Sequence, residues 1–330
     1  MRILVTGGAG YVGSVSVEHL AGAGHELVVL DTYATSRPGA NLAGATVVHG
    51  TYTDREAVAD VLRDERIDAV LHCGARSLVG ESIREPALYF RENVSGGIAL
   101  LEAMRDVGVK RLVISSTAAV YGVPDATPIA EDAPLRPINP YGESKRSLEG
   151  AAGWFASAYG LRAVALRYFN VAGASVTNGE RHDPETHLIP NALRAVTGGP
   201  PLTLFGTDYA TPDGTPIRDY VHVLDLAEAH RLALEATAPG DPRTSRLLAC
   251  NLGSGVGFSV REVVAATERV VGRPVPHTIG ERRAGDPPTL VADITRASEV
   301  LDWAPDRSSL EDMVGSAWRW WSARSGSPAE

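Results

Sequence analysis

The pair Tyr141 and Lys145 is the part of this sequence whose residue types and spacing most directly suggest chemistry. On a helix, side chains four residues apart share one face, so this phenol and this ammonium would lie side by side. A nearby positive charge favours the phenolate and brings a phenol with an unperturbed pKa near ~10 closer to working pH. The pair could therefore accept and return a proton, if a cofactor-binding fold surrounds it. Taken alone, it could equally be a chance pair on a surface helix.

A glycine-rich segment near the start of the chain predicts where such a cofactor would lie. Gly7, Gly10 and Gly13 follow the β-rich run 2–5 and open an amphipathic stretch, which is the setting of a dinucleotide fingerprint. Glycines at this spacing allow a tight turn and a close approach of the backbone to a pyrophosphate at a helix N-terminus. Asp31 ends the next β-rich run, where a carboxylate would bind the adenosine ribose and repel a 2′-phosphate, so the pattern favours NAD over NADP.

The chain alternates short β-rich runs with longer amphipathic stretches, which predicts a doubly wound α/β fold with a parallel sheet. The β-rich runs are Arg2 to Val5, Glu26 to Leu30, Ala45 to Val48, Ala69 to His72, Arg111 to Ser115 and Arg162 to Arg167; the helical stretches include Ser14 to Gly22, Arg55 to Asp64 and Ser95 to Val107, the last ended by Gly108. From about Val171 the chain becomes rich in Gly, Pro, Thr and Asp. We therefore expect an NAD-binding Rossmann domain at 1–170 and a smaller mixed α/β domain at 171–330 that binds the substrate. The segment around 219–255 could belong to the first domain although it lies in the second half of the chain.

Composition narrows the class of protein. The chain has 330 residues, 44% of them hydrophobic, and a net charge of −9, which argues against a nucleic acid as partner. We expect no membrane insertion and no signal peptide, because the opening apolar run is short and no long one follows. Cys73 and Cys250 lie far apart without a paired-cysteine motif, so we expect a reducing, cytoplasmic location.

The glycine segment and the Tyr141/Lys145 pair together make the chain resemble an extended short-chain dehydrogenase/reductase of the NAD(P)-dependent epimerase/dehydratase family. Five further segments are similar to the corresponding blocks of the UDP-glucose 4-epimerases: residues 115–122, 167–170, 205–209, 218–223 and 282–286. The resemblance runs from Met1 into the 300s, and it implies a homodimer that binds a UDP-sugar and functions in galactose metabolism.

The resemblance also implies a mechanism. Tyr141 would take the proton of the sugar C4 hydroxyl while C4 gives a hydride to the nicotinamide, and Thr117 would relay or stabilise that proton. The bound 4-keto sugar would turn over in the pocket and receive the hydride on its opposite face. Lys145 would stay charged, hold the nicotinamide ribose and favour the phenolate. Ala118 and Ala119 follow Thr117 where sugar dehydratases carry acidic residues, so we expect oxidation and re-reduction without elimination.

Two larger sets of residues follow from the same resemblance. The residues expected to contact NAD are Gly7, Gly10, Tyr11, Val12, Gly13, Asp31, Thr32, Ser36, Thr51, Tyr52, Cys73, Gly74, Ala75, Ser77, Asn93, Lys145 and Phe169. The residues expected to contact the UDP-sugar are Thr117, Tyr141, Asn170, His187, Leu188, Leu202, Phe205, Arg218, Arg283, Asp286 and Leu290. In the second set, Leu202 and Phe205 would lie against the uracil, and the two arginines would bind the diphosphate as forked donors.

A metal site is a further possibility that the sequence raises in the segment 182–187. Its histidines could act as ligands, but Pro184 breaks the helix that would set their spacing, so we expect no metal.

Some positions depart from the family pattern. Thr51 stands where an Asp usually contacts the adenine edge, Cys73 replaces an aromatic residue or Leu, and Val15 replaces a common His. We therefore expect NAD to bind more weakly than is typical. Leu290 stands where residue size controls access of groups at sugar C2, and its intermediate size predicts activity on UDP-N-acetylglucosamine beside UDP-glucose.

The sequence leaves two alternatives to a UDP-glucose 4-epimerase. The first is a 4-epimerase or reductase of another nucleotide sugar, such as UDP-N-acetylglucosamine, a UDP-uronic acid, a pentose or a dTDP-sugar. The second is a non-catalytic dinucleotide-sensing module, which would have no need of Thr117, Tyr141 and Lys145 together.

Overall fold

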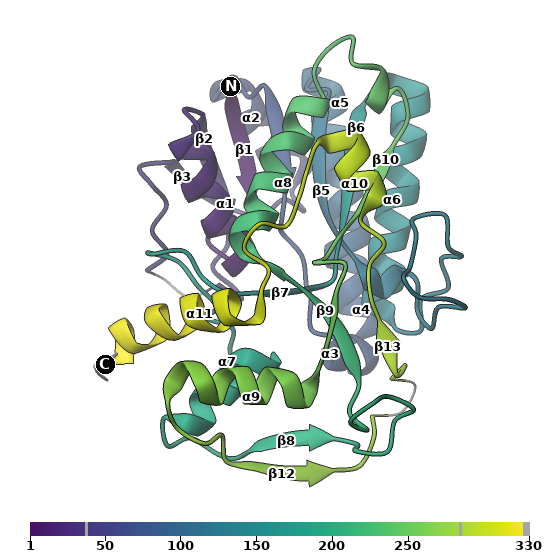
Figure 1. Ribbon diagram of the computed structural model, residues 1–330. Helices are drawn as coiled ribbons and strands as arrows, with labels where there is room; N and C mark the ends of the chain where they lie inside the picture. Colours follow the sequence, from purple (N-terminus) through teal and green to yellow (C-terminus); the bar gives the residue numbers. More distant parts are fainter. Residues whose placement is uncertain (37–38, 284–285, 326–330) are drawn as a thin grey trace.

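A seven-stranded parallel sheet forms the larger part of the molecule in this computed structural model, which describes residues 1–36, 39–283 and 286–325 (Figure 1). The strand order is β10-β6-β5-β4-β1-β2-β3. The strands are β1 (Arg2–Thr6), β2 (Glu26–Asp31), β3 (Thr46–His49), β4 (Ala69–His72), β5 (Arg111–Thr117), β6 (Arg162–Tyr168) and β10 (Leu248–Leu252). The order reverses between β1 and β4, and ligands of open α/β sheets bind at the carboxyl ends of the strands beside such a point.

Helices cover both faces of this sheet and bury its strands, except for the edge strand β3, which is largely exposed. Ile3 and Val5 of β1 pack into a core with α1 (Tyr11–Gly22) and α8 (Val223–Ala236), whereas Leu4 packs on the other face with the second group of helices. That group contains α2 (Arg55–Asp64), α5 (Gly97–Val107) and α6 (Pro140–Tyr159). Because both faces are covered, the strands are apolar runs without polar alternation, as parallel strands usually are.

The fold class predicted from the sequence is confirmed, and its six predicted strands are present with ends shifted by a residue or two. The predicted helix from Ser95 begins instead in a π-helix, η1 (Phe90–Gly96), which continues into α5. Gly108 ends α5 at a φ of 88°, as a C-cap glycine does. Strand β10 pairs with β6, so this part of the segment 219–255 lies in the large sheet. The domain boundary at 170 stays a prediction.

The later part of the chain builds a smaller layer beside the carboxyl ends of the large sheet (Figure 1). Strands β7 (Asn170–Ala172), β11 (Gly257–Ser259) and β13 (Thr289–Leu290) all pair with β9 (Ile217–His222), and β8 (Leu202–Phe205) pairs with β12 (His277–Gly280). Helices α7 (Leu188–Val196), α9 (Val260–Val271) and α11 (Leu310–Ser325) pack together around a separate core. Over the described residues, no helix has the length and apolar character needed to cross a membrane.

The remaining elements are short. They are α3 (Val79–Arg84), α4 (Pro86–Tyr89), α10 (Thr295–Leu301) and two 3₁₀ turns, η2 (Ala118–Val120) and η3 (Pro242–Thr244). Of these, η2 matters most for the site, because it follows Thr117 directly and supports the start of α6.

Candidate active site

The turn between β1 and α1 is packed so closely that only glycine fits at two of its positions. A Cβ on Gly13 would lie 2.2 Å from the carbonyl oxygen of Gly7, and one on Gly7 would lie 2.6 Å from the backbone of Gly74. Gly10 is the N-cap of α1 and supplies no side-chain cap to this helix. The N–H groups of the first turn are therefore available to an anion, and the turn fits a dinucleotide pyrophosphate.

Asp31 is held rigidly at the end of β2. Its carboxylate accepts hydrogen bonds from the backbone N–H of Ala9 at 2.9 Å, the backbone N–H of Tyr33 at 2.7 Å and the hydroxyl of Ser36 at 3.0 Å. An ionised carboxylate has about four acceptor positions, so one stays open to a ribose hydroxyl. This geometry fits the predicted role of Asp31 and gives Ser36 a supporting one.

The other residues expected to contact the cofactor follow the carboxyl ends of neighbouring strands. Thr51 and Tyr52 follow β3, whereas Cys73, Gly74, Ala75 and Ser77 follow β4. The Tyr52 ring packs edge-on against His72, with ring centroids 4.9 Å apart, and closes over Gly74.

Tyr11 and Asn93, two further residues expected to contact NAD, have side chains bonded to other parts of the protein. The Tyr11 hydroxyl donates to the carbonyl of Gly173 at 2.5 Å, so the phenol is directed toward the smaller layer and only the backbone of this residue faces the turn's anion position. Asn93 of η1 donates to the carbonyl of Arg76 at 3.0 Å and to the hydroxyl of Ser144 at 2.9 Å. Asn93 thereby ties the loop after β4 to helix α6.

The start of α6 rests directly on the end of β5, and this contact positions Tyr141. Asn139 caps the helix by accepting from the backbone N–H of Gly142 at 2.9 Å. A Cβ on Gly142 would lie 2.4 Å from the carbonyl oxygen of Ala119 in η2, so glycine is required beside Tyr141 for the helix to approach this closely. As a result the Tyr141 hydroxyl meets the Thr117 side chain in a hydrogen bond, which brings two of the three predicted catalytic residues together.

The electrostatics of Tyr141 and Lys145 differ from the expectation. Burial raises the pKa of Tyr141, and the hydrogen bond with Thr117 lowers it by a smaller amount. Burial lowers the pKa of Lys145 to about 8, against the opposing effects of Cys73 and Glu149. The Lys145 ammonium donates to the carbonyl of Ser115 at 2.7 Å. The prediction that Lys145 by itself lowers the pKa of Tyr141 is therefore wrong for the protein without ligands, because desolvation is the larger effect.

Cations of the predicted nucleotide site lie in the smaller layer, each in contact with a neighbour. Arg218 of β9 forms an ion pair with Asp286 at 2.5 Å, and the guanidinium of Arg283 lies 4.2 Å from the centre of the Phe205 ring. These four predicted residues are thus joined in two pairs. Ala284 and Gly285 of the same block lie outside the described residues.

Leu202 is not placed where the prediction requires. Its side chain is buried in a core formed with α7 and α9, whereas Phe205 is partly exposed on the opposite face of β8. Because side chains alternate along a strand, positions three apart face opposite ways. Thr203 shares the face of Phe205, since a Cβ on Gly280 would touch both. The alternation of β8 was the signal that could have selected Thr203 from the sequence.

Three other predicted residues lie near the catalytic strand end. Phe169 and Leu290 pack in one cluster with Val120 and Tyr121, which follow Thr117. Asn170 begins β7 and donates to the carbonyl of Asp219 at 3.0 Å. Leu290 is paired in register with Arg218, so the position expected to control sugar size adjoins the arginine expected to bind phosphate.

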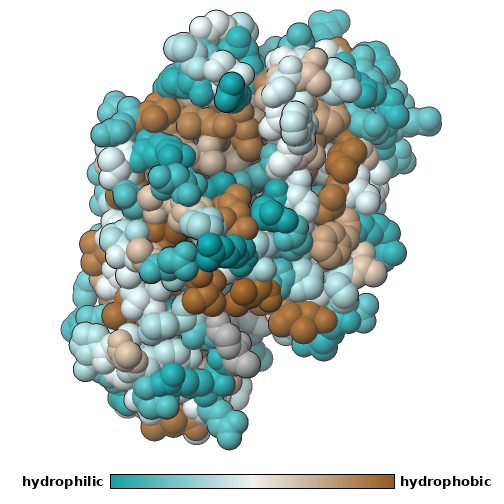
Figure 2. Space-filling model, turned by 90° about the vertical axis from the view of Figure 1, so that its right-hand side faces the viewer, coloured by the Kyte–Doolittle hydropathy of each residue, from teal (hydrophilic) through white to brown (hydrophobic). Residues whose placement is uncertain are grey.

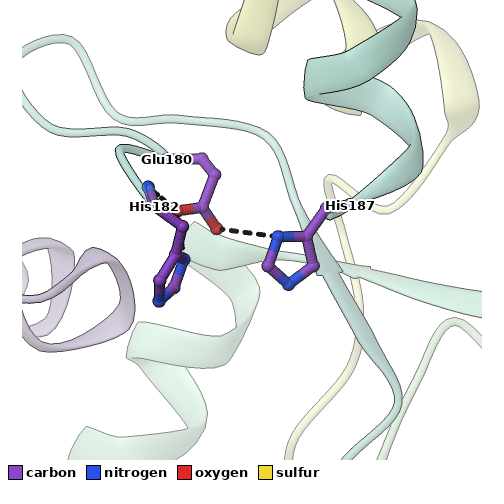
Figure 3. A group of neighbouring side chains, drawn as sticks. All are labelled: Glu180, His182 and His187. Carbon is purple, nitrogen blue, oxygen red and sulfur yellow. Dashed lines mark hydrogen bonds and ion pairs between the residues drawn. The ribbon is translucent and has the colours of Figure 1, made fainter. Parts of the chain in front are cut away.

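The loop before α7 brings two histidines to opposite sides of one carboxylate (Figure 3). Nδ1 of His182 lies 2.5 Å from Glu180, and Nδ1 of His187 lies 3.6 Å from Glu180 and 2.7 Å from Glu185. The segment 182–187 is not helical, as expected from Pro184, but the loop brings the two histidines together at Glu180 without a helix, so the missing helix does not argue against a metal site. Burial lowers the pKa of each imidazole, but the neighbouring carboxylates outweigh it and raise the pKa of both rings. The absence of a metal stays a prediction. Leu188 follows His187 as the first residue of α7.

The structure also reveals a buried group behind the catalytic pair that sequence reasoning missed. Glu149, one turn after Lys145 on α6, forms an ion pair with Arg167 and accepts a hydrogen bond from Ser116. The four-residue spacing that led from Tyr141 to Lys145 would have led on to Glu149.

Comparison with known proteins agrees with this arrangement. The model of the NAD dependent epimerase/dehydratase family matches residues 3–249. The chain belongs to this family.

Relatives within the family cover nearly the whole chain. A UDP-glucose 4-epimerase of Lactobacillus helveticus is 48% identical over 323 residues, which are 97% of each chain. The crystal structure of UDP-glucose 4-epimerase from Brucella ovis in complex with NAD has a TM-score of 0.92 at 44% identity, covering 96% of this chain and 97% of that one. The enzyme from Bifidobacterium longum, in complex with NAD⁺ and UDP, has a TM-score of 0.92 at 32% identity, covering 99% and 100%.

Proposed function

We propose that this protein interconverts UDP-glucose and UDP-galactose by epimerisation at C4, with NAD as its resident cofactor. The observation that carries the proposal is the Tyr141–Thr117 hydrogen bond, one helical turn before Lys145, at the carboxyl edge of a sheet whose β1–α1 turn fits a dinucleotide. The named relatives, which are UDP-glucose 4-epimerases over nearly the full length of the chain, support the same reaction.

Proton transfer in this mechanism belongs to Tyr141. Its hydroxyl is held by Thr117 where a sugar C4 hydroxyl would approach, so a proton can pass between sugar and phenol with little rearrangement. When bound, NAD supplies a hydride acceptor and donor together with a positive charge that favours the phenolate. Lys145, one helical turn after Tyr141 and bonded to the carbonyl of Ser115, adds the second positive charge.

The residues after Thr117 limit the reaction to epimerisation. Ala118 and Ala119 form the 3₁₀ turn η2 against the start of α6, and neither side chain can donate or accept a proton. A 4-keto sugar held beside this turn has no acid there to expel its C6 hydroxyl. It can only take back a hydride at C4, on either face.

Binding of the nucleotide falls to the smaller layer. Arg218 and Arg283 supply cations on an otherwise acidic chain, and Phe205 with Thr203 offers one strand face to the uracil. The diphosphate would compete with Asp286 for Arg218, so this ion pair must open or be shared on binding.

Incubation with a panel of UDP- and dTDP-sugars tests the proposal. An epimerase converts UDP-glucose to UDP-galactose without added NADH and without a net change in absorbance at the nicotinamide band. A reductase would require stoichiometric NADH, and a sensing module would convert none of the sugars. Separation of the C4 epimers by chromatography distinguishes all three, and conversion of only another nucleotide sugar would contradict the UDP-glucose assignment.

We also propose a homodimer formed by helices α5 and α6. The two helices pack closely, since a Cβ on Gly97 would lie 2.6 Å from the Leu148 side chain. On their outer faces, Trp154 is 77% exposed and Ile98 is 37% exposed. The face of the molecule seen in Figure 2 carries several separate apolar patches among polar residues. A two-fold axis would join this helix pair to its copy as a four-helix bundle.

The oligomeric state of a Trp154→Arg variant tests this interface. Multi-angle light scattering should give a dimer for the wild type and a monomer for the variant, because the bundle cannot bury two guanidiniums. Val176→Arg is the control, since Val176 is 94% exposed and lies outside α5 and α6. A monomeric wild type, or a dimer that survives Trp154→Arg, would contradict the proposal. A cytoplasmic location also stays a proposal, with which the two free thiols are compatible.

A further inference from the structure

Glu149 is a buried carboxylate directly behind the catalytic pair. It follows Tyr141 and Lys145 at the same four-residue spacing on α6, so the three side chains share one face of the helix. Its side chain is only 4% exposed, and a buried carboxylate requires a charged partner or several donors.

Both kinds of partner are present. Arg167 of β6 donates to Glu149 from Nε at 3.1 Å and from its terminal nitrogen at 2.7 Å, a forked pair with fixed geometry. The hydroxyl of Ser116 donates to the same carboxylate at 2.5 Å. Arg167 is held in turn by the hydroxyl of Tyr121 at 2.8 Å and by the carbonyl of Glu131 at 3.1 Å.

The last three residues of β5 therefore each meet one residue of the α6 face. The carbonyl of Ser115 accepts from Lys145, the hydroxyl of Ser116 donates to Glu149, and the side chain of Thr117 bonds to Tyr141. Of these helix residues, only Glu149 is also bonded to a third element, through Arg167 on β6. It thus fixes the position of α6 along β5.

We propose that Glu149 is a positioning residue of the active site, an inference that rests on the proposed epimerase function. Its carboxylate, held by Arg167, keeps Ser116 and so the end of β5 against α6, which aligns Thr117 with Tyr141, and it places a negative charge one helical turn from Lys145.

The charges around Lys145 give this proposal a signature in the pH dependence. The groups around its ammonium come from several elements: the carbonyl of Ser115 on β5, Glu149 on α6, His72 at the end of β4 and Cys73 after β4. Among them, burial lowers the pKa of His72 and raises that of the Cys73 thiol, which leaves both uncharged at neutral pH, so the negative charge of this set comes from the Glu149 carboxylate in its ion pair with Arg167.

The sign of the effect follows from this charge. Removing it disfavours the ammonium, so the pKa of Lys145 falls, and favours the phenolate, so the pKa of Tyr141 falls as well. In the pH profile of activity, the acidic limit reflects loss of the Tyr141 phenolate and the basic limit reflects loss of the Lys145 ammonium. Both limits should move to lower pH, and the basic limit should move further because Lys145 is one helical turn from Glu149 and Tyr141 is two. These limits are macroscopic values of the coupled pair. A purely structural ion pair would change the amount of active protein equally at every pH.

Three variants separate position from charge, each assayed with NAD and UDP-galactose from pH 6 to 10. Ser116→Ala removes one contact and keeps the charge: kcat should fall about 3- to 10-fold, the loss of one hydrogen bond, with KM unchanged and the pH limits unmoved. Glu149→Gln removes the charge as well, and should lower kcat further and move both limits to lower pH. Glu149→Asp keeps the negative charge on a shorter side chain. Its pH limits should therefore equal those of the wild type, whereas its kcat should stay below the wild-type value.

Glu143→Gln is the matched control. It removes a carboxylate from the same helix, where Glu143 pairs with Arg146 near the surface. Its kcat and pH limits should equal those of the wild type. Circular dichroism and melting temperature identify unfolded variants, and if Glu149→Gln fails to fold, Ser116→Ala and Glu149→Asp still decide. The proposal is overturned if Ser116→Ala has the wild-type kcat, or if folded Glu149→Gln keeps the wild-type pH limits.

Discussion

The two regions that would meet a nucleotide sugar are built in different ways. Around Tyr141 and Thr117, charged side chains such as Lys145 and Glu149 are buried and each is held by a group of the neighbouring strands, Lys145 by the carbonyl of Ser115 and Glu149 by Arg167. In the smaller layer the groups are more exposed and are bonded to each other, as Arg218 is to Asp286 and Arg283 to Phe205. The catalytic region is thus arranged before the substrate arrives, whereas the nucleotide region must exchange partners to bind it.

This difference predicts how substitutions divide between rate and affinity. A group fixed for chemistry acts mainly in the transition state, so its loss lowers kcat. A cation that trades a carboxylate for a phosphate contributes to binding of substrate and transition state alike, so its loss raises KM. Substitutions in the two regions should therefore separate cleanly.

The largest effect should come from Tyr141→Phe. This change removes the proton acceptor and leaves a ring of nearly the same shape beside Tyr89, whose ring centroid is 6.3 Å away. We expect kcat to fall by about 10³-fold, within the range of general acid–base catalysis, with the melting temperature little changed. Tyr159→Phe at the far end of α6 is the control. A variant with more than a tenth of the wild-type kcat would show that Tyr141 is not the base.

Arg218→Ala should have the next largest effect, and it should appear in KM. The loss of a charge-assisted hydrogen bond of about 1.5–3 kcal/mol corresponds to a KM for UDP-galactose about 10- to 100-fold higher. Arg218→Lys should recover only part of this, because an ammonium lacks the forked geometry. Arg269→Ala, which breaks a surface pair with Glu311, is the control. A loss confined to kcat would contradict the division between the two regions.

How well the sequence predicted each region reflects the same contrast. The glycine turn, Asp31 and the Tyr141/Lys145 pair depend on short-range spacing, so the sequence located them. Spacing along α6 could have pointed to Glu149, but its ion pair with Arg167 on β6 and the effect of burial on the pKa of Tyr141 depend on contacts between elements, which spacing along one helix does not show. Leu202 was assigned to the uracil by resemblance, but its side chain lies in the core. The alternation of side chains along β8 could have shown this from the sequence, because Leu202 and Phe205 face opposite ways.

Leu290→Tyr should change specificity more than rate. Leu290 lies beside Phe169 and Tyr121 in one cluster, and a phenol there would extend further into the space expected for the C2 substituent. The wild type should turn over UDP-N-acetylglucosamine measurably, and the variant should lose at least about tenfold in kcat/KM on this sugar while keeping UDP-glucose, a difference on the scale of a steric pocket contact. Leu290→Met controls for the substitution itself. A wild type inactive on the acetylated sugar would refute the prediction.

The smallest effect concerns retention of NAD at Thr51. In the structure the Thr51 hydroxyl bonds to that of Thr53 at 2.9 Å, so it is engaged within its own loop, and no carboxylate stands at this position for the adenine edge. The purified wild type should carry less than one NAD per chain, and Thr51→Asp should bind it about 2- to 10-fold more tightly, the worth of one net hydrogen bond. Thr51→Val, which adds no acceptor, should not tighten binding. Absorbance of the acid-released cofactor measures the content and titration calorimetry the affinity; one NAD per wild-type chain would show that the buried contacts of the β1–α1 turn suffice without the carboxylate.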